Sequence, residues 1–360
     1  MSAYAMYRLP YASKYTVITQ TIGLPEELPS LHSLDGKSGF VIAPFNISAA
    51  EPVLLLHPDR TETHTIKPES LVTGRRARNT EEYNKEREQY AKDFSTYHNR
   101  LTKGVFKKIV LARSTTEDMA HETAVEQLFL RACRLYPRMF IGLIHTEKSG
   151  TWLTATPETL LESKSGKWHT MALAGTMRLT GQTLDFDNPP VADGSPDGSI
   201  HWSDKNRKEQ RLVADYIESV LRPFAKDIER GEVHTVRAAD IVHLRSDFSF
   251  SLNKTYTLGQ LLKALHPTPA VCGLPKTDTY RFITDNEHTP RSYYSGFMGP
   301  LNPDGDTHLF VSLRCMQICG SHCKLYAGGG LLADSEEQQE WNETEEKLKT
   351  MRQVLGEIEL

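Results

Sequence analysis

The chain has 360 residues, of which 39% are apolar and 24% are charged, and its formal net charge is −4. This composition is typical of a globular protein with a large core, and it gives no electrostatic reason to expect binding to nucleic acid or to an anionic membrane. Because no apolar run approaches the length of a membrane span and no basic-then-apolar leader opens the sequence, we expect a cytoplasmic protein.

The first half of the chain predicts strands and helices, and one strand contains an unusual lysine. Apolar residues at helical spacing predict a helix over 79–101, and β-branched and apolar residues predict a strand over 106–113. Lys108 lies on the same side of that strand as Phe106 and Val110, where an ammonium is costly to bury unless it is paired. Two interpretations stay open: a functional lysine, or a lysine whose ammonium reaches water at the start of the strand.

Paired strands are predicted next, over 139–146 and 150–163, after a helix near 123–135. Glu158 directly follows a proline in the second strand, where the strand must bend. This residue is either functional or an ordinary glutamate of a surface turn. A further strand over 167–173 ends in small residues that could present backbone amides to a ligand.

The helix predicted over 203–221 carries a carboxylate in register with its apolar stripe, and Ser203 is its expected cap. Glu209 shares a face with Val213 and Ile217, so we expect it to point inward and to need a counter-charge. Oxygen ligands of this kind suit Mg²⁺, which takes one or two carboxylates together with substrate oxygens.

The last third of the chain predicts a helix over 258–265 and core strands over 291–299 and 308–318. Arg314 alternates with Phe310 and Met316 on a half-apolar face of the second of these strands. A guanidinium in that position offers a bidentate grip on a carboxylate.

The C-terminal stretch predicts a strand, a turn of three glycines over 328–330 and a long helix capped by Asp334 and Ser335. Glu340, Glu343 and Lys347 form one stripe of that helix. The stripe could hold a metal ion and an anionic ligand together. The alternative, which is the commoner meaning of such charges, is a solvated Glu/Lys face.

Several motifs, in this order, resemble those of the chorismate-utilising enzymes, which include isochorismate, salicylate, anthranilate and aminodeoxychorismate synthases. The motifs are Lys108-Ile-Val-Leu-Ala-Arg113, Ala155-Thr-Pro-Glu158, Leu173-Ala-Gly-Thr176, Arg207-Lys-Glu209, Pro267-Thr-Pro-Ala-Val-Cys-Gly273, Tyr294-Ser-Gly296, Leu313-Arg-Cys315, Ala327-Gly-Gly-Gly330 and Glu340-Trp-Asn-Glu-Thr344. The resemblance implies an α/β (α+β) fold with two stacked, mostly antiparallel β-sheets surrounded by helices in one large domain. Residues 1–100 would be strands and a helix of the same globule, and residues 101–360 the chorismate-binding catalytic domain.

The resemblance also implies roles for individual residues. Glu209 and Glu343 would hold Mg²⁺, with Glu340 contacting it through water. Lys108 would be the general base for the attacking water, and Glu158 the general acid for the departing 4-hydroxyl. The residues implied in holding the substrate chorismate are Gly175, Thr176, Tyr294, Arg314, Gly328, Gly330 and Lys347.

Two positions discriminate between the branches of the family. Lys108 together with Ala174 resembles the water-using pattern, which implies an isochorismate synthase, an isomerase that feeds menaquinone or siderophore biosynthesis. The alternatives are a salicylate synthase, an ammonia-using anthranilate-type subunit and a catalytically inactive dicarboxylate-binding relative. Asn206 departs from the family pattern, which usually has an acidic residue there that helps to hold metal-bound water. We expect a monomer or a weak dimer.

Overall fold

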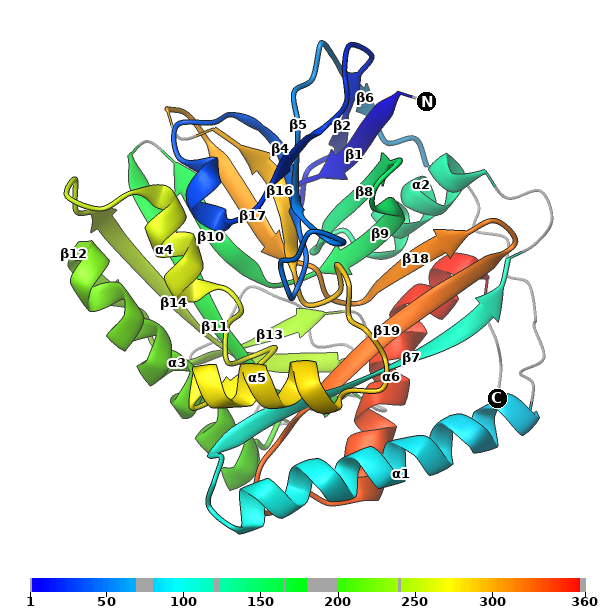
Figure 1. The fold of residues 1–360 in the computed structure, drawn as a ribbon, viewed down its shortest axis with the longest axis vertical. Helices are drawn as coiled ribbons and strands as arrows, with labels where there is room; N and C mark the ends of the chain where they lie inside the picture. The colour runs from blue at the N-terminus through cyan, green and yellow to red at the C-terminus, as the bar shows by residue number, and fades with distance from the viewer. Residues whose placement is uncertain are drawn as a thin grey trace.

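Two large β-sheets form the centre of the molecule, and the α-helices lie around them (Figure 1). The computed structural model describes residues 2–68, 80–119, 124–164, 166–179, 200–238, 241–302 and 304–356. Within these ranges every pair of neighbouring strands is antiparallel. The prediction of two stacked, antiparallel-rich sheets with surrounding helices is confirmed.

Sheet A has nine strands within the described ranges. In spatial order they are β15 (Gly273–Leu274), β7 (Lys108–Asp118), β19 (His322–Leu331), β18 (Cys315–Cys319), β9 (Gly150–Thr156), β8 (Phe140–Thr146), β1 (Ala3–Arg8), β2 (Lys14–Gln20) and β6 (Arg60–Thr65). The alternation along β7 matters most for the site. Ala112 packs in a cluster between the sheets, whereas Ile109 and Leu111 pack in a cluster with the aromatic residues of a helix.

Sheet B has ten strands in the same ranges. In spatial order they are β12 (Ala225–Arg230), β14 (Ile241–Leu252), β11 (Lys167–Arg178), β10 (Thr159–Lys164), β17 (Thr307–Val311), β16 (Phe297–Leu301), β4 (Gly39–Ala43), β5 (Val53–Leu56) and β3 (Glu26–Leu28), and β13 (His234–Ala238) also pairs with β14. The two sheets pack through apolar side chains. Phe140 of sheet A and Phe310 of sheet B are stacked with their ring centroids 4.1 Å apart.

The helices cover the outer surfaces of the sheets. They are α1 (Thr80–Thr102), α2 (Val125–Leu135), α3 (Asp204–Phe224), α4 (Leu258–Leu265), α5 (Lys276–Asn286) and α6 (Glu337–Leu355), and a 3₁₀ helix spans Leu31–Leu34. Helix α3 begins where the sequence predicts, because the side chain of Ser203 accepts a hydrogen bond from the Asn206 amide. Its apolar stripe, with Val213 and Ile217, packs in the same cluster as residues of sheet B.

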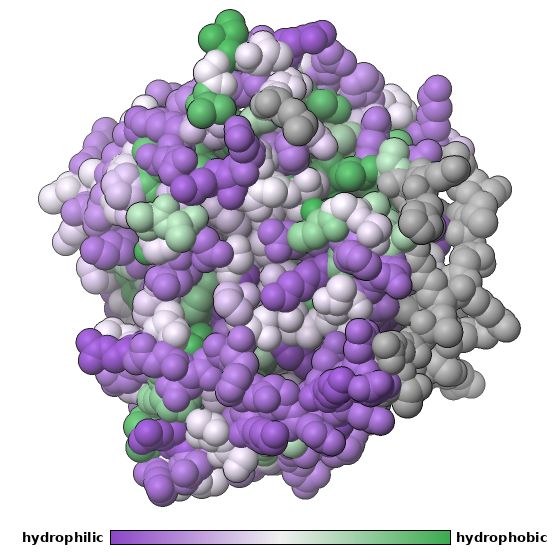
Figure 2. All heavy atoms as spheres, turned by 45° about the vertical axis from the view of Figure 1, so that its right-hand side comes forward, coloured by the Kyte–Doolittle hydropathy of each residue, from purple (hydrophilic) through white to green (hydrophobic). Residues whose placement is uncertain are grey.

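The surface view agrees with the composition. Figure 2 shows hydrophilic side chains over most of one face, with hydrophobic residues in small separate groups. The large exposed apolar residues are Tyr11, Ile22, Leu24 and Val105. No helix within the described ranges combines the length and apolar character of a membrane-crossing segment.

The chain crosses from one sheet to the other at two places that later define the site. Strand β9 belongs to sheet A and β10 to sheet B, and Glu158 lies in the bend between them. Strand β17 belongs to sheet B and β18 to sheet A, and Arg314 lies between them with a positive φ of 45°. Each crossing therefore holds a charged side chain at the junction of the two sheets.

The strand predicted over 150–163 is two strands in different sheets, and the strand predicted over 167–173 continues to Arg178. Three predictions about the last third of the chain are also wrong. The stretch 308–318 is two strands rather than one, because the chain changes sheets at 312–314, so Arg314 does not alternate along a strand. Residues 292–296 form a turn, and the strand that follows begins only at Phe297.

The third error concerns the C-terminal segment. Residues 328–330 lie inside strand β19, paired with β7, and do not form a turn. Helix α6 begins after Glu336 without a side-chain cap, since the Ser335 hydroxyl instead accepts a hydrogen bond from the Leu332 amide. The residues over 180–199, where frequent Asp, Gly and Pro predict an exposed loop, lie outside the described residues.

Candidate active site

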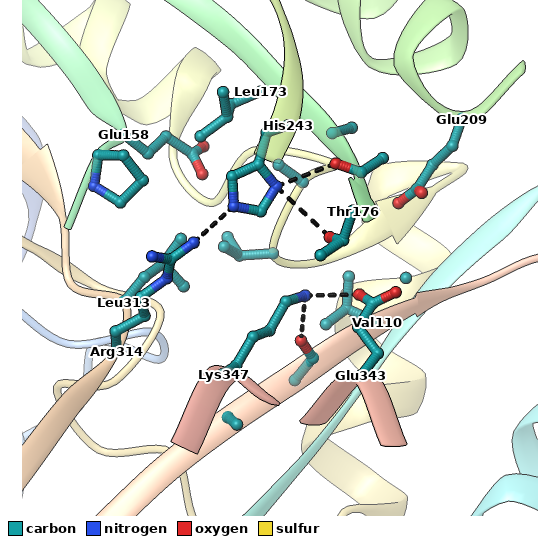
Figure 3. A pocket seen from close by; sticks show the side chains of 18 of the residues that line it. Val110, Glu158, Leu173, Thr176, Glu209, His243, Leu313, Arg314, Glu343 and Lys347 are labelled. Carbon is teal, nitrogen blue, oxygen red and sulfur yellow. Dashed lines mark hydrogen bonds and ion pairs between the residues drawn. The ribbon is translucent and has the colours of Figure 1, made fainter. Parts of the chain in front are cut away.

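A pocket with about 650 Å³ of empty space opens between the two sheets, where both crossings meet strands β7, β11 and β19. Its lining contains all of the predicted site residues except Lys108 and Glu340. Figure 3 shows side chains from both sheets and from α3 and α6 around this space. Segments far apart in the sequence therefore supply one site.

Lys108 is fully buried at the first residue of β7 and forms an ion pair with Glu209 of α3. The Nζ atom of Lys108 lies 3.0 Å from Oε1 of Glu209. A Cβ atom at Gly330 would lie 2.2 Å from that same oxygen, so the pair fits only against bare backbone. The interpretation of Lys108 as a lysine that reaches water is therefore wrong, because only 1% of its side-chain surface is exposed.

Glu158 is also buried, with 3% of its surface exposed. Burial raises the pKa of its carboxyl to about 7, against the opposing effect of the positive charges of Lys108 and Lys347. A carboxyl group with this pKa still carries a proton about half of the time at neutral pH. Glu158 is thus suited to donate a proton, and the interpretation of a surface turn is wrong.

Helix α6 presents its two carboxylates to strand β19, and each is paired with a lysine. Lys347 donates a hydrogen bond of 2.7 Å to Glu343, and Lys205 of α3 forms an ion pair with Oε1 of Glu340. Oε2 of Glu340 is buried and has no hydrogen-bond partner among the described residues. The stripe is therefore not a solvated face.

The two α6 carboxylates influence each other. Burial, and next the negative charge of Glu343, raise the pKa of Glu340 to about 7, although Lys205 opposes this rise. For Glu343, burial favours a higher pKa, but the ion pair with Lys347 keeps its pKa below the ordinary value. A Cβ atom at Gly329 would lie 3.3 Å from Oε2 of Glu340 and 3.9 Å from Oε1 of Glu343, so both oxygens approach the same stretch of backbone.

The three predicted metal ligands do not yet converge on one point. Within the described ranges, no three acidic, histidine or cysteine side chains form a ready-made group around one position. Glu209, Glu343 and Glu340 are instead each held by a lysine. Glu340 and Glu343 lie close together near Gly329, whereas Glu209 lies against Gly330.

Arg314 projects into the pocket beside a histidine that the sequence analysis missed. His243 of β14 lies 2.9 Å from the Gly175 carbonyl through Nδ1 and 2.5 Å from the Arg314 guanidinium through Nε2 (Figure 3). Because a guanidinium can only donate, Nε2 accepts and the proton sits on Nδ1. Burial, followed by the charges of Arg314 and Lys347, keeps the pKa of His243 well below its usual value, so this imidazole is neutral. A histidine between Val242 and Leu244 in an apolar strand was the signal in the sequence.

The remaining walls are small residues and one tyrosine. Gly175 has a φ of +72° and lies at a break in the β11–β14 register, where a Cβ atom would lie 3.2 Å from Asn206. Tyr294 is buried, and its hydroxyl lies against Gly328. A Cβ atom added to Gly328 would lie 2.7 Å from the hydroxyl oxygen of Tyr294. Lys347 also donates to the Gly328 carbonyl at 2.9 Å. These residues shape a pocket with cationic groups on one side.

The fold and the pocket define a class of protein: two stacked antiparallel sheets with a pocket between them that is lined by Arg314, Lys347 and a buried glutamate, Glu158. The profile of one protein family, described as "Chorismate binding enzyme", matches residues 48–356. The chain therefore belongs to this family.

Individual relatives agree with this assignment. The "Salicylate biosynthesis isochorismate synthase" of Pseudomonas aeruginosa is 31% identical over 284 residues, which are 76% of this chain and 56% of the relative. "Isochorismate synthase DhbC" of Bacillus subtilis is 29% identical over 71% of this chain and 65% of its own length. The chain thus spans between half and two thirds of the length of these two curated relatives.

Solved structures show the same fold. MenF, the menaquinone-specific isochorismate synthase from Escherichia coli, superposes with a TM-score of 0.78 over 98% of this chain and 88% of that one, at 22% identity. The putative 2,3-dihydroxybenzoate-specific isochorismate synthase DhbC from Bacillus anthracis gives a TM-score of 0.80 over 98% of this chain and 95% of that one, at 20% identity.

Proposed function

We propose that this protein is an isochorismate synthase, which converts chorismate to isochorismate by adding water at C2 and removing the 4-hydroxyl. The observation that carries the proposal is the pair of buried groups at the pocket, a lysine held by Glu209 and a glutamate whose pKa is about 7. A substitution of one hydroxyl for another needs a base for the incoming water and an acid for the leaving group. Lys108 and Glu158 supply one of each.

Binding of the substrate follows from charge. Chorismate carries two carboxylates, and the lining of the pocket includes two cationic side chains, those of Arg314 and Lys347. Burial lowers the pKa of Arg314 only to about 10, so it stays cationic at neutral pH. Its contact with His243 fixes the guanidinium in one orientation, which is what a directional grip on a carboxylate requires.

The reaction can be written with the protein's own groups. Lys108 in its neutral form takes a proton from water as the oxygen bonds to C2 of the ring. The double bonds shift, the C4–O bond breaks, and Glu158 gives its proton to the departing hydroxyl as water. An ammonium cannot accept a proton, so Lys108 acts as a base only after its ion pair with Glu209 is broken and the ammonium has given one proton to solvent.

We propose Mg²⁺ as the cofactor, held by Glu209 and Glu343 with Glu340 nearby. The residues fit a hard cation, because Glu340 has a buried oxygen without a partner and the α6 carboxylates repel each other. When bound, the ion supplies positive charge that binds the substrate carboxylate. To bind the ion, Glu209 would have to give up its ion pair with Lys108. Binding of the metal and release of Lys108 would therefore occur together.

The experiment that tests the function is incubation of the protein with chorismate and Mg²⁺ followed by chromatography of the products. Isochorismate, in a reversible reaction, supports the proposal. Salicylate and pyruvate in equal amounts would instead make it a salicylate synthase, and anthranilate formed with ammonium would overturn both. Unchanged chorismate would identify an inactive relative. We further propose a cytoplasmic monomer or weak dimer whose product enters menaquinone or siderophore biosynthesis.

A further inference from the structure

The face of β7 opposite the pocket carries a second group of buried charges, which the reaction does not use. Arg113 is 6% exposed and its guanidinium lies 3.8 Å above the ring of Trp341 in α6. Its Nε donates to the Thr344 hydroxyl at 2.7 Å, and its Nη2 pairs with Glu345. One side chain of the sheet therefore contacts three positions of the same helix.

These contacts lie directly beside the carboxylates that we propose as metal ligands. Trp341 follows Glu340 in the chain, and Thr344 follows Glu343. Successive residues of an α-helix are about 100° apart around its axis, so the angular position of each carboxylate is set by that of its neighbour. Holding Trp341 and Thr344 fixes how α6 is rotated.

Thr344 and Trp341 make further contacts that also restrict the helix. The Thr344 hydroxyl donates to the Trp341 carbonyl at 2.7 Å while it accepts from Arg113. The Trp341 ring, which also contacts Arg113, packs edge-on against Tyr90 of α1, with ring centroids 5.2 Å apart. The helix is thus held between β7 and α1 with little freedom to turn.

We propose that Arg113 is a positioning residue that sets the rotation of α6 and thereby places Glu340 and Glu343 for the metal ion. This inference rests on the proposed function. Side-chain tips lie roughly 6 Å from a helix axis, so a rotation of about 10° would move a carboxylate by about 1 Å. Such a shift is comparable with the tolerance of a metal site, and loss of a residue that orients ligands typically weakens metal affinity about 10- to 100-fold.

The chain offers a matched control in Arg352, another buried arginine of the same group of charges. Arg352 pairs with the second oxygen of Glu345 at 2.9 Å and with Glu117 at 2.8 Å. It lies at the far end of α6, and its described contacts do not include Trp341 or Thr344. Arg113→Lys and Arg352→Lys therefore both disturb ion pairs between β7 and α6, but only the first disturbs the contacts with Trp341 and Thr344, which lie beside the two carboxylates.

The test is calorimetric titration of each protein with Mg²⁺ in the absence of substrate, together with thermal unfolding. We expect Arg113→Lys to raise the dissociation constant about 10- to 100-fold and Arg352→Lys to leave it within about twofold, while both lower the unfolding temperature. Thr344→Val should weaken Mg²⁺ binding in the same sense, and Thr344→Ser should restore it. Equal changes in both arginine variants, or none in either, would overturn the inference.

Failure of the metal assignment would be visible separately. If the unaltered protein binds no Mg²⁺, the proposed cofactor is wrong, and crystal structures of Arg113→Lys and of the unaltered chain decide the inference instead. We expect the carboxylates of Glu340 and Glu343 to be displaced together by about 1 Å in the variant, as a rotation of α6 requires. Unchanged carboxylate positions would contradict it.

Discussion

The two faces of strand β7 both carry buried charges, but the charges are satisfied to different degrees. On the pocket side, Lys108 has one carboxylate contact, the ion pair with Glu209, and its Nζ makes no hydrogen bond of good geometry in the described structure. On the opposite side, Glu345 receives a guanidinium on each of its two oxygens, although Nη2 of Arg352 has no hydrogen-bond partner in the described structure. We therefore expect the ion pairs on the pocket side to change partners during the reaction and those on the opposite side to remain in place.

This difference has a physical basis. Leaving a buried carboxylate incompletely paired costs free energy, so such a group persists only where the rest of the fold holds it in place. The raised pKa values of Glu158 and Glu340, both about 7, report that cost. The ion pairs on the opposite face offset this free-energy cost, because they fix β7 and α6, from which side chains of the site project.

The largest expected effect comes from removing a carboxylate on the pocket side. Glu343→Ala and Glu209→Ala should each abolish isochorismate formation, because each removes a charged ligand and leaves its lysine without a carboxylate partner. Product chromatography and Mg²⁺ titration measure both consequences. Glu340→Gln should be milder if its contact with the ion runs through water. Glu117→Gln, on the opposite face, is the matched control and should keep its turnover; full activity of Glu343→Ala in chelated buffer would refute the metal assignment.

The acid and the base come next in size. Lys108→Gln and Glu158→Gln should each lower kcat by about 10²- to 10⁴-fold, the usual contribution of a positioned proton donor or acceptor. Chorismate should still bind, because Arg314 and Lys347 remain. Steady-state kinetics separate the two effects as a fall in kcat with little change in KM. A Lys108→Gln protein with near-normal turnover would exclude this mechanism.

The motifs identified the residues of the site from the sequence, but not how the chain delivers them. Lys108 and Glu209 stand out in the sequence as charges in an apolar pattern, because burying a charge is costly. Glu158 stands out by the proline before it, and the family resemblance implies the role of each. The position of Arg314 was misread, because the change of sheet at 312–314 depends on pairing with distant strands. His243 was overlooked, since its role depends on Gly175 and Arg314, which only the fold brings together.

The glycines of β19 illustrate the same limit. A triple glycine favours a turn on local grounds, yet tertiary structure uses Gly328 and Gly330 as strand residues without side chains. The reason is space: Tyr294 and the Lys108–Glu209 pair occupy the volume that a Cβ atom would need. Nothing in the local sequence records which distant side chains will fill that volume.

A third prediction exploits this spacing. Gly330→Ala would place its Cβ 2.2 Å from Glu209 and 2.8 Å from Lys108, so the ion pair must move. A displacement of about 1 Å can reduce turnover about 10²-fold, which we expect for kcat of this variant. Gly329→Ala meets its nearest neighbour at 3.3 Å and is the control, with a smaller loss. Equal activities of the two variants would show that the approach to Gly330 is not needed.

The fourth prediction is the pH dependence of the pocket side. Because Glu158 must be protonated to act as an acid and burial raises its pKa to about 7, its active fraction falls as the pH rises through that value. We expect the alkaline limb of kcat/KM to fall about tenfold per pH unit above about 7. Glu158→Gln should remove this limb from the residual rate. A limb that persists unchanged in the variant would assign the ionisation to another group.

The smallest effect on activity is expected on the opposite face, and it sharpens the contrast most. Arg352→Gln removes the guanidinium that pairs with Glu117 and with one oxygen of Glu345, which should lower the free energy of unfolding by about 3–5 kcal/mol while kcat stays unchanged. Replacing both members of one pair, as in Glu117→Met with Arg352→Leu, should recover much of that loss, since apolar side chains of similar volume often replace a buried ion pair without cost. Denaturant unfolding and turnover measure the two quantities on the same samples.

The equivalent exchange on the pocket side, Lys108→Met with Glu209→Leu, should also be tolerated by the fold but should eliminate turnover. If the Arg352 variants lost turnover as well, the two faces of β7 would not differ in whether their ion pairs change partners during the reaction.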